Sequence, residues 1–184
     1  MRKIIALCLT IMLAALCAGC GGEKAAVPVS KIAWSLSEGL NEGHSYVYFQ
    51  MTNNTDTPIL GFRVIFRIRD GATPEEREQF LHDLQESQNF DDGFMQGFLS
   101  DLTKNGGEPV MTASGSETLQ PGQTSELTLC YYMGGWTSKD LLYGDLFEAK
   151  MFVVTYEKDG KILEQTYDYD SEAYTVQPAQ QPGQ

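Results

Sequence analysis

The feature that most constrains the fold is a period of two along residues 62–69, which read Phe-Arg-Val-Ile-Phe-Arg-Ile-Arg. Every second side chain is large and apolar, and three of the four others are arginines. Successive side chains of a β-strand point to opposite faces of its sheet, so this pattern predicts a strand that buries one face and turns the arginines toward water. The arginines are Arg63, Arg67 and Arg69.

Further segments carry the β-strand signal of aromatic or β-branched side chains bounded by turn sequences. The expected strands are 31–37, 45–52, 125–133, 147–156, 162–169 and a short one at 172–176. Asp159-Gly160, between two of these segments, is typical of a tight hairpin. Six or seven such strands predict a mainly β fold, an antiparallel sandwich.

A helical pattern interrupts the strands at residues 73–105. Thr73, Pro74 and Glu76 have the sequence of a capping box with proline at the first helical position. A second helix follows, capped by Asp91 or Asp92 and ended by the glycines at 106–107. We therefore expect a two-helix insert. The apolar stripe of its second half includes Phe90, Phe94, Met95 and Phe98.

The first twenty residues have the layout of an export signal, with Arg2 and Lys3 before an apolar run. That run has about 15 residues, fewer than the roughly 20 that a membrane-spanning helix needs. Its end, Leu-Cys-Ala-Gly-Cys20, resembles the lipobox of bacterial lipoproteins. The resemblance implies cleavage before Cys20 and acylation of Cys20 with diacylglycerol and palmitate, which anchors the chain to the cell membrane or the outer membrane. The alternative is an ordinary signal peptide cleaved after Ala18.

These signals divide the chain into a signal peptide (1–19), a flexible tether (20–29), a sandwich domain with its insert (30–176) and a disordered tail (177–184). Loss of the signal peptide removes two of the 13 basic residues and none of the 25 acidic ones, which leaves a net charge of −14. Such a surface repels nucleic-acid phosphates and anionic lipids. We expect no nucleic-acid partner, and attachment to the bilayer through the acyl chains alone.

Cys130 is the one unmodified cysteine of the mature chain, because Cys8 and Cys17 leave with the signal and Cys20 carries lipid. Its position within an expected strand favours a buried packing residue over a nucleophile. The sequence contains no familiar catalytic or dinucleotide-binding motif. We expect no enzymatic activity, no catalytic residue, no metal ligand and no cofactor. An envelope hydrolase with paired acids, or with His44 beside a nucleophile, is the alternative class.

Phe66-Arg-Ile-Arg-Asp70 resembles the naming motif of the FxLYD-type immunoglobulin-like domains found in many secreted bacterial lipoproteins, with Ile for Leu and Arg for Tyr. The flanking sequences at 53–55, 119–122 and 156–160 agree, and together the matches cover about half of the mature chain. The resemblance implies an immunoglobulin-like sandwich that serves adhesion, assembly or an accessory role. It carries over no catalytic residues.

Four features are candidate binding sites, each with a structural alternative. The arginines at 63, 67 and 69 are suited to gripping an anion, or they pair with acids of neighbouring strands. The acidic pairs 91–92, with Asp101 nearby, and 168 with 170 offer oxygen ligands for calcium, or are solvated charge and helix caps. Trp136, after two glycines, either contacts a ligand or closes the core. The acids expected to pair with the arginines are Glu148, Glu157, Asp168 and Asp170.

The apolar stripe of the insert is the fourth candidate, because a helical pair outside the sandwich has to bury its apolar face somewhere. It either packs against the sandwich or offers a partner protein or lipid an exposed patch. The sequence thus favours a membrane-anchored envelope lipoprotein that acts as a non-catalytic binding or accessory module, with another envelope protein as partner. A small-ligand or calcium-binding lipoprotein is the alternative.

Overall fold

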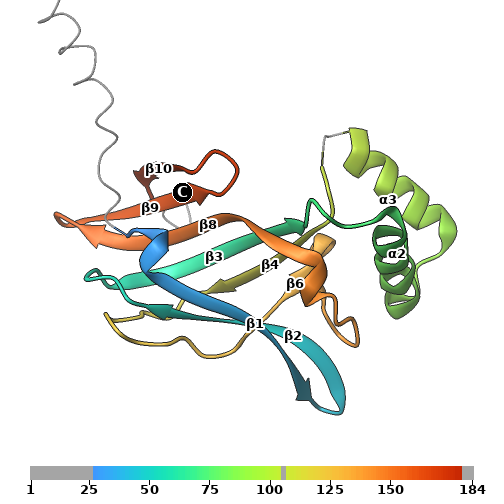
Figure 1. The fold of residues 1–184 in the computed structure, drawn as a ribbon, viewed down its shortest axis with the longest axis horizontal. Coiled ribbons are helices and arrows are strands. Elements are labelled where there is room, and N and C mark those ends of the chain that lie inside the picture. The colour runs from blue at the N-terminus through green and yellow to red at the C-terminus, as the bar shows by residue number, and fades with distance from the viewer. Residues whose placement is uncertain (1–26, 105–106, 180–184) are drawn as a thin grey trace, which may run out of the picture.

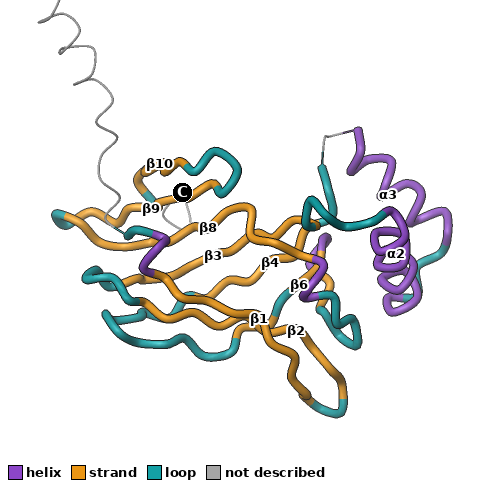
Figure 2. Tube along the Cα trace, in the orientation of Figure 1, coloured by secondary structure: helices purple, strands orange, loops and turns teal. Residues whose placement is uncertain are grey.

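The computed structural model describes residues 27–104 and 107–179, which form two antiparallel sheets and two α-helices (Figures 1 and 2). The helices are α2 (Pro74–Gln88) and α3 (Asp92–Lys104), and the 3-10 turns are η1 (Val29–Lys31), η2 (Met133–Gly135) and η3 (Gly144–Leu146). The smaller sheet has the order β1 (Ile32–Asn41), β2 (His44–Asn53), β5 (Thr128–Leu129). The larger sheet has the order β10 (Ala173–Pro178), β9 (Lys161–Asp168), β8 (Phe147–Lys158), β3 (Ile59–Ile68), β4 (Val110–Gly115), β6 (Tyr131–Tyr132), β7 (Trp136–Thr137).

The strand order is that of an immunoglobulin-like sandwich. Strands β1–β2–β5 correspond to A-B-E of that fold, and β3–β8–β9 correspond to C-F-G. β3 and β8 are antiparallel, with Phe62 opposite Val154 and Val64 opposite Phe152. The predicted fold class, a mainly β antiparallel sandwich with a two-helix insert, is confirmed.

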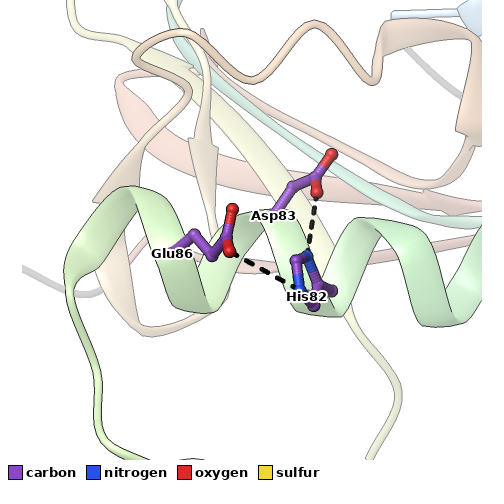
Figure 3. Close-up of side chains that lie close together, drawn as sticks. All are labelled: His82, Asp83 and Glu86. Carbon is purple, nitrogen blue, oxygen red and sulfur yellow. Dashed lines mark hydrogen bonds and ion pairs between the residues drawn. The ribbon is translucent and has the colours of Figure 1, made fainter.

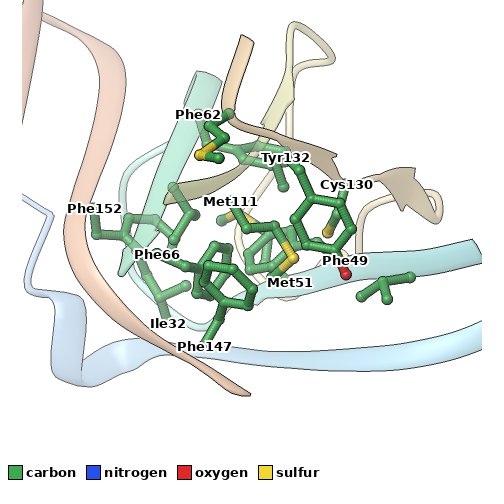
Figure 4. Close-up of a cluster of buried hydrophobic side chains, with 14 of the residues drawn as sticks. Ile32, Phe49, Met51, Phe62, Phe66, Met111, Cys130, Tyr132, Phe147 and Phe152 are labelled. Atoms are coloured by element: carbon green, nitrogen blue, oxygen red, sulfur yellow. The ribbon is translucent and has the colours of Figure 1, made fainter. Parts of the chain in front are cut away.

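The core lies between the two sheets and centres on Phe49 of β2 (Figure 4). Its ring centroid lies 5.5 Å from that of Phe62, 6.1 Å from that of Phe66 and 6.4 Å from that of Phe152. Burial alternates along β2 and β3, as the sequence period predicts. Each large apolar side chain removed from water stabilises the fold by about 1.5–3 kcal/mol. The alternation that identified β3 in the sequence therefore also holds the two sheets together.

The described residues contain ten strands, more than the six or seven expected. One reason is that the segment expected as a single strand at 125–133 divides at Cys130. Before this residue the chain pairs with β2, and after it the chain pairs with β4 in the other sheet. The backbone N–H of Cys130 donates to the carbonyl of Val47, 2.9 Å away, at the crossing point. A further strand, β4, carries no strong signal in its short sequence, yet it pairs along β3.

The side chain of Asn53 joins the turn that follows β2 to the segment that begins at Leu119. Its amide nitrogen donates to the carbonyls of Thr57 and Leu119, and its amide oxygen accepts from both the backbone N–H and the hydroxyl of Thr55. The side chain is fully buried, and it is the partner of the Thr55 N–H, whereas the carbonyl of Leu119 also accepts from the N–H of Ile59. Two of the sequence segments that carry the family resemblance thus meet in space.

The helical insert begins as the sequence predicts. The hydroxyl of Thr73 accepts from the N–H of Glu76, and the carboxylate of Glu76 accepts from the N–H of Thr73, which makes a capping box. α2 is attached to the sandwich by two fully buried residues, Phe80 and Leu84. The ring of Phe80 packs edge-on against Tyr132 at 5.1 Å and against Phe147 at 5.4 Å. The helices therefore cover one end of the sandwich (Figure 1).

The first and last described residues lie toward the other end of the molecule, remote from the helices (Figure 1). Val27 is fully buried, and its backbone is held by the side-chain amide of Gln165 in β9. The domain thus starts within the segment expected as tether, at 27 rather than 30, and β10 extends to Pro178 rather than to 176. The hydrophobic period of the sequence did not show either boundary, because contacts with β9 and β10 order these two ends. Neither described helix has the length and apolar character of a segment that crosses a bilayer.

Candidate functional site

The structure brings together two candidates that lie far apart in the sequence, the apolar stripe of the insert and Trp136. The ring centroid of Trp136 lies 4.6 Å from that of Phe90, 6.3 Å from that of Phe94 and 5.6 Å from that of Phe98. The rings of Phe94 and Phe98 are nearly parallel, at 6°. We call Phe90, Phe94, Phe98 and Trp136 the aromatic cluster.

Local backbone chemistry places each half of the aromatic cluster. Asp91 caps α3, because its carboxylate accepts from the backbone N–H of Phe94 at 2.8 Å. On the other side, Gly134 has a φ of 77°, and a Cβ at this position would lie 2.5 Å from the ring of Trp136. Only glycine lets the indole lie against the backbone here. Gly134 thus allows Trp136 to take the position in which it contacts α3.

The stripe divides into a buried and an exposed part. Met95 is 4 % exposed, so it belongs to the packing, whereas Phe94 is 46 % exposed. Phe90, Phe98 and Trp136 are partly exposed. Part of the apolar face of the insert is therefore buried against the sandwich, as the structural alternative predicted, and part remains open to a partner.

The three arginines have different surroundings. Arg63 and Arg67 lie in β3, and Arg69 is the first residue after it. Arg67 contacts three carboxylates, those of Glu148, Asp170 and Asp70. Hydrogen bonding to Glu148, followed by the charges of Asp170 and Asp70, raises the pKa of Arg67. Glu148 and Asp170, two of the four acids expected as partners of the arginines, therefore do pair with Arg67. This network occupies the guanidinium of Arg67 and leaves it little capacity for an external anion.

Arg69 lies at the base of the insert, where it contacts Glu76 and the backbone carbonyl of Asp145. It lines a cavity of about 240 Å³ between α2 and η3, together with Gln79 and Tyr143. Arg63 is exposed on the outer face of the larger sheet and has no ion pair among the described residues. The structure therefore does not gather the three arginines into one anion site.

The acidic candidates for calcium have structural roles where they are described. Asp91 caps α3, and Asp92 accepts from the side-chain amide of Gln85 at 2.7 Å. Asp168 accepts from the backbone N–H groups of Asp170 and Ser171, and hydrogen bonding to Ser171 is the main cause that lowers the pKa of Asp168. The side chain of Asp101 and the acylation candidate Cys20 lie outside the described residues.

Cys130 is fully buried, and this burial raises its pKa to about 12. The thiolate that a nucleophile or a metal ligand requires is therefore scarce at neutral pH. Its position supports the interpretation as a packing residue.

His82, Asp83 and Glu86 of α2 form a group that was not among the candidates expected from the sequence, and their ligand atoms lie within 4.8 Å of one another (Figure 3). The sequence carried the signal, since Glu86 follows His82 by four residues and Asp83 by three, and side chains at these spacings are neighbours on a helix. Comparison of the chain with protein-family models, with curated proteins and with solved structures finds no match.

Proposed function

We propose that the chain is a lipid-anchored envelope protein that binds another envelope protein through the aromatic cluster. The observation that carries the proposal is the half-exposed ring of Phe94, held in a fixed position by Phe90, Phe98 and Trp136. Rigid aromatic side chains bury a large area at little cost in conformational entropy, which is why they are frequent at the centres of protein interfaces.

The position of the anchor favours a protein over a lipid as the partner. The seven residue steps from Cys20 to Val27 span at most roughly 25 Å. Val27 is held by Gln165, which lies opposite Val154 in β8, while the helices pack at Phe147 at the start of that strand. The two points are seven residues, or about 23 Å, apart along β8. The tether of an acylated Cys20 would thus enter the domain about 23 Å from the point where the helices pack, which favours an orientation with the aromatic cluster directed away from the bilayer.

The charge around the aromatic cluster specifies the partner further. Asp91 and Asp92 begin α3 beside Phe94, in a chain whose formal net charge is −12. Complementary charge around an apolar centre speeds association and excludes wrong partners. The partner surface is therefore an apolar pocket with a basic rim, and the complex weakens as ionic strength rises.

Photo-crosslinking in the native envelope tests this function. A crosslinker placed at Gly97, an exposed position of α3 three residues after Phe94 where an added side chain meets nothing within 4 Å, captures the partner from cells that express the full chain. Phe94→Ala should abolish the crosslinked product, whereas the matched control Ile162→Ala, which removes a 53 % exposed side chain at the other end of the sandwich, should retain it. A product that persists in Phe94→Ala, or no product in the wild-type chain, contradicts the proposed interface.

Metabolic labelling with palmitate tests the anchor separately. The wild-type chain should incorporate the label and fractionate with membranes, and Cys20→Ser should do neither, because the acylated thiol is then missing. An unlabelled wild-type chain would support ordinary cleavage near Ala18 instead.

A further inference from the structure

Three potential metal ligands lie together on the outer side of α2 (Figure 3). Nδ1 of His82 lies 3.2 Å from Oδ1 of Asp83, and Nε2 of His82 lies 3.6 Å from Oε1 of Glu86. The ligands of a tetrahedral site with bonds of about 2.1 Å are roughly 3.4 Å apart. These two contacts use different nitrogens of the ring, and a single ion would take only one of them, with one ligand atom from each residue lying within 4.8 Å of the others. Side-chain rotations that shorten the longest separation bring one imidazole nitrogen and two carboxylate oxygens to one ion.

The carboxylate of Asp83 is already oriented by groups outside the ligand set. Its Oδ2 accepts from the hydroxyl of Tyr143 at 2.5 Å, and its Oδ1 accepts from the side-chain amide of Gln79 at 2.7 Å. The ring of Tyr143 is in turn packed edge-on against Phe80 at 5.2 Å. Hydrogen bonding to Tyr143 is the main cause that lowers the pKa of Asp83, so this ligand is ionised at neutral pH. Partners of this kind fix ligand orientation in metal sites.

The charge of α2 also favours a bound cation. Residues 74–88 contain five acidic side chains and one arginine, and the last turn has no basic side chain. The partial negative charge at the C-terminal end of a helix favours cations and disfavours acids. Asp83 and Glu86 lie in the C-terminal half of α2, where His82 contacts both of them.

We propose that His82, Asp83 and Glu86 bind one divalent transition-metal ion of the Zn²⁺ class, with water completing its coordination. An imidazole nitrogen with two carboxylates suits Zn²⁺ and its neighbours. Ca²⁺ prefers six to eight oxygen ligands, which this group does not offer. The site is separate from the aromatic cluster and does not depend on the proposed function. Because Asp83 is also bonded to Tyr143, a bound ion stiffens the attachment of the insert to the sandwich.

Calorimetric titration of the untagged full chain, stripped of metal with a chelator, tests this site with ZnCl2 as the probe. We expect one equivalent of Zn²⁺ to bind, to raise Tm with Zn²⁺ concentration, and to bind far more tightly than Ca²⁺. His82→Ala and Glu86→Gln, both at exposed positions, should weaken binding at least about tenfold. Tyr143→Phe keeps all three ligands, and it should weaken binding about 10- to 100-fold because Asp83 loses its orientation.

The other histidine supplies a matched control. Nδ1 of His44 contacts the carboxylate of Asp140 at 2.8 Å, but within the described residues His44 belongs to no group of three ligands. His44→Ala should therefore bind Zn²⁺ as the wild-type chain does. Absorption of bound Co²⁺ should show a nitrogen- and oxygen-ligated ion that disappears in His82→Ala. Equal Zn²⁺ affinity in the wild-type chain and in His82→Ala, or equal affinity for Ca²⁺ and Zn²⁺, overturns the proposal.

Discussion

Phe80→Ala should destabilise the whole domain, because Phe80 fastens the insert to the sandwich. The side chain is 0 % exposed and packs against three rings, those of Tyr132, Tyr143 and Phe147. Truncation of a buried phenylalanine loses its transfer free energy and leaves a cavity, at a cost of about 3–5 kcal/mol. A domain of this kind has only about 5–15 kcal/mol of stability in total. One substitution in the insert should thus remove about a fifth or more of it.

Urea unfolding followed by circular dichroism measures this effect. With a slope of about 2 kcal/mol per molar urea, a loss of 4 kcal/mol lowers the midpoint by about 2 M. Phe94→Ala is the control, since its ring is 46 % exposed and its loss should cost about 1 kcal/mol or less. A Phe80→Ala midpoint within about 0.5 M of the Phe94→Ala midpoint would refute the view that insert and sandwich share one core.

Three further predictions concern single buried or partly buried groups. Asn53→Ala should cost about 1–3 kcal/mol in the same unfolding assay, because it orphans the N–H of Thr55 and removes one of the two donors to the carbonyl of Leu119. Cys130, with its pKa raised to about 12, should resist iodoacetamide at pH 8 until urea unfolds the chain, and rapid labelling of the folded chain would contradict its burial. The pKa of Asp83 is lowered in the folded state, so the stability it contributes is present above its unfolded value of about 3.9 and is lost as the pH falls through the folded value. Tyr143→Phe should raise that pKa in a carboxyl NMR titration, and an unchanged value would show that the hydroxyl does not hold the carboxylate.

Local sequence chemistry was enough to predict several elements. The alternation at 62–69 identified β3, and Thr73 with Glu76 marked the start of α2 to the residue. The hairpin between β8 and β9 forms at Asp159 and Gly160, both with positive φ, as their residue types favour. In each case the determining interaction lies within a few residues of the sequence signal, which is why the sequence reveals it.

Other features depend on contacts between distant segments, and the sequence pattern could not show them. The strand signal of 125–133 is continuous, yet the chain changes sheets at Cys130 because β2 and β4 compete for its backbone hydrogen bonds. The hairpin between β1 and β2 turns at Glu42 and Gly43, which lack the usual Asn-Gly or Asp-Gly signal. Likewise, each half of the aromatic cluster was a candidate by itself, but only the fold shows that Trp136 packs on α3.

The buried contacts of Val27 have a mechanical consequence for the lipid anchor that we propose. The side-chain amide of Gln165 accepts from the N–H of Val27 at 3.4 Å and donates to its carbonyl at 2.5 Å. Next to it, the hydroxyl of Tyr174 accepts from the N–H of Val29 at 2.9 Å. Tension arriving along the tether is therefore carried first by side chains of β9 and β10 in the larger sheet. These contacts have to break before the pull can begin to peel β1 away from β2.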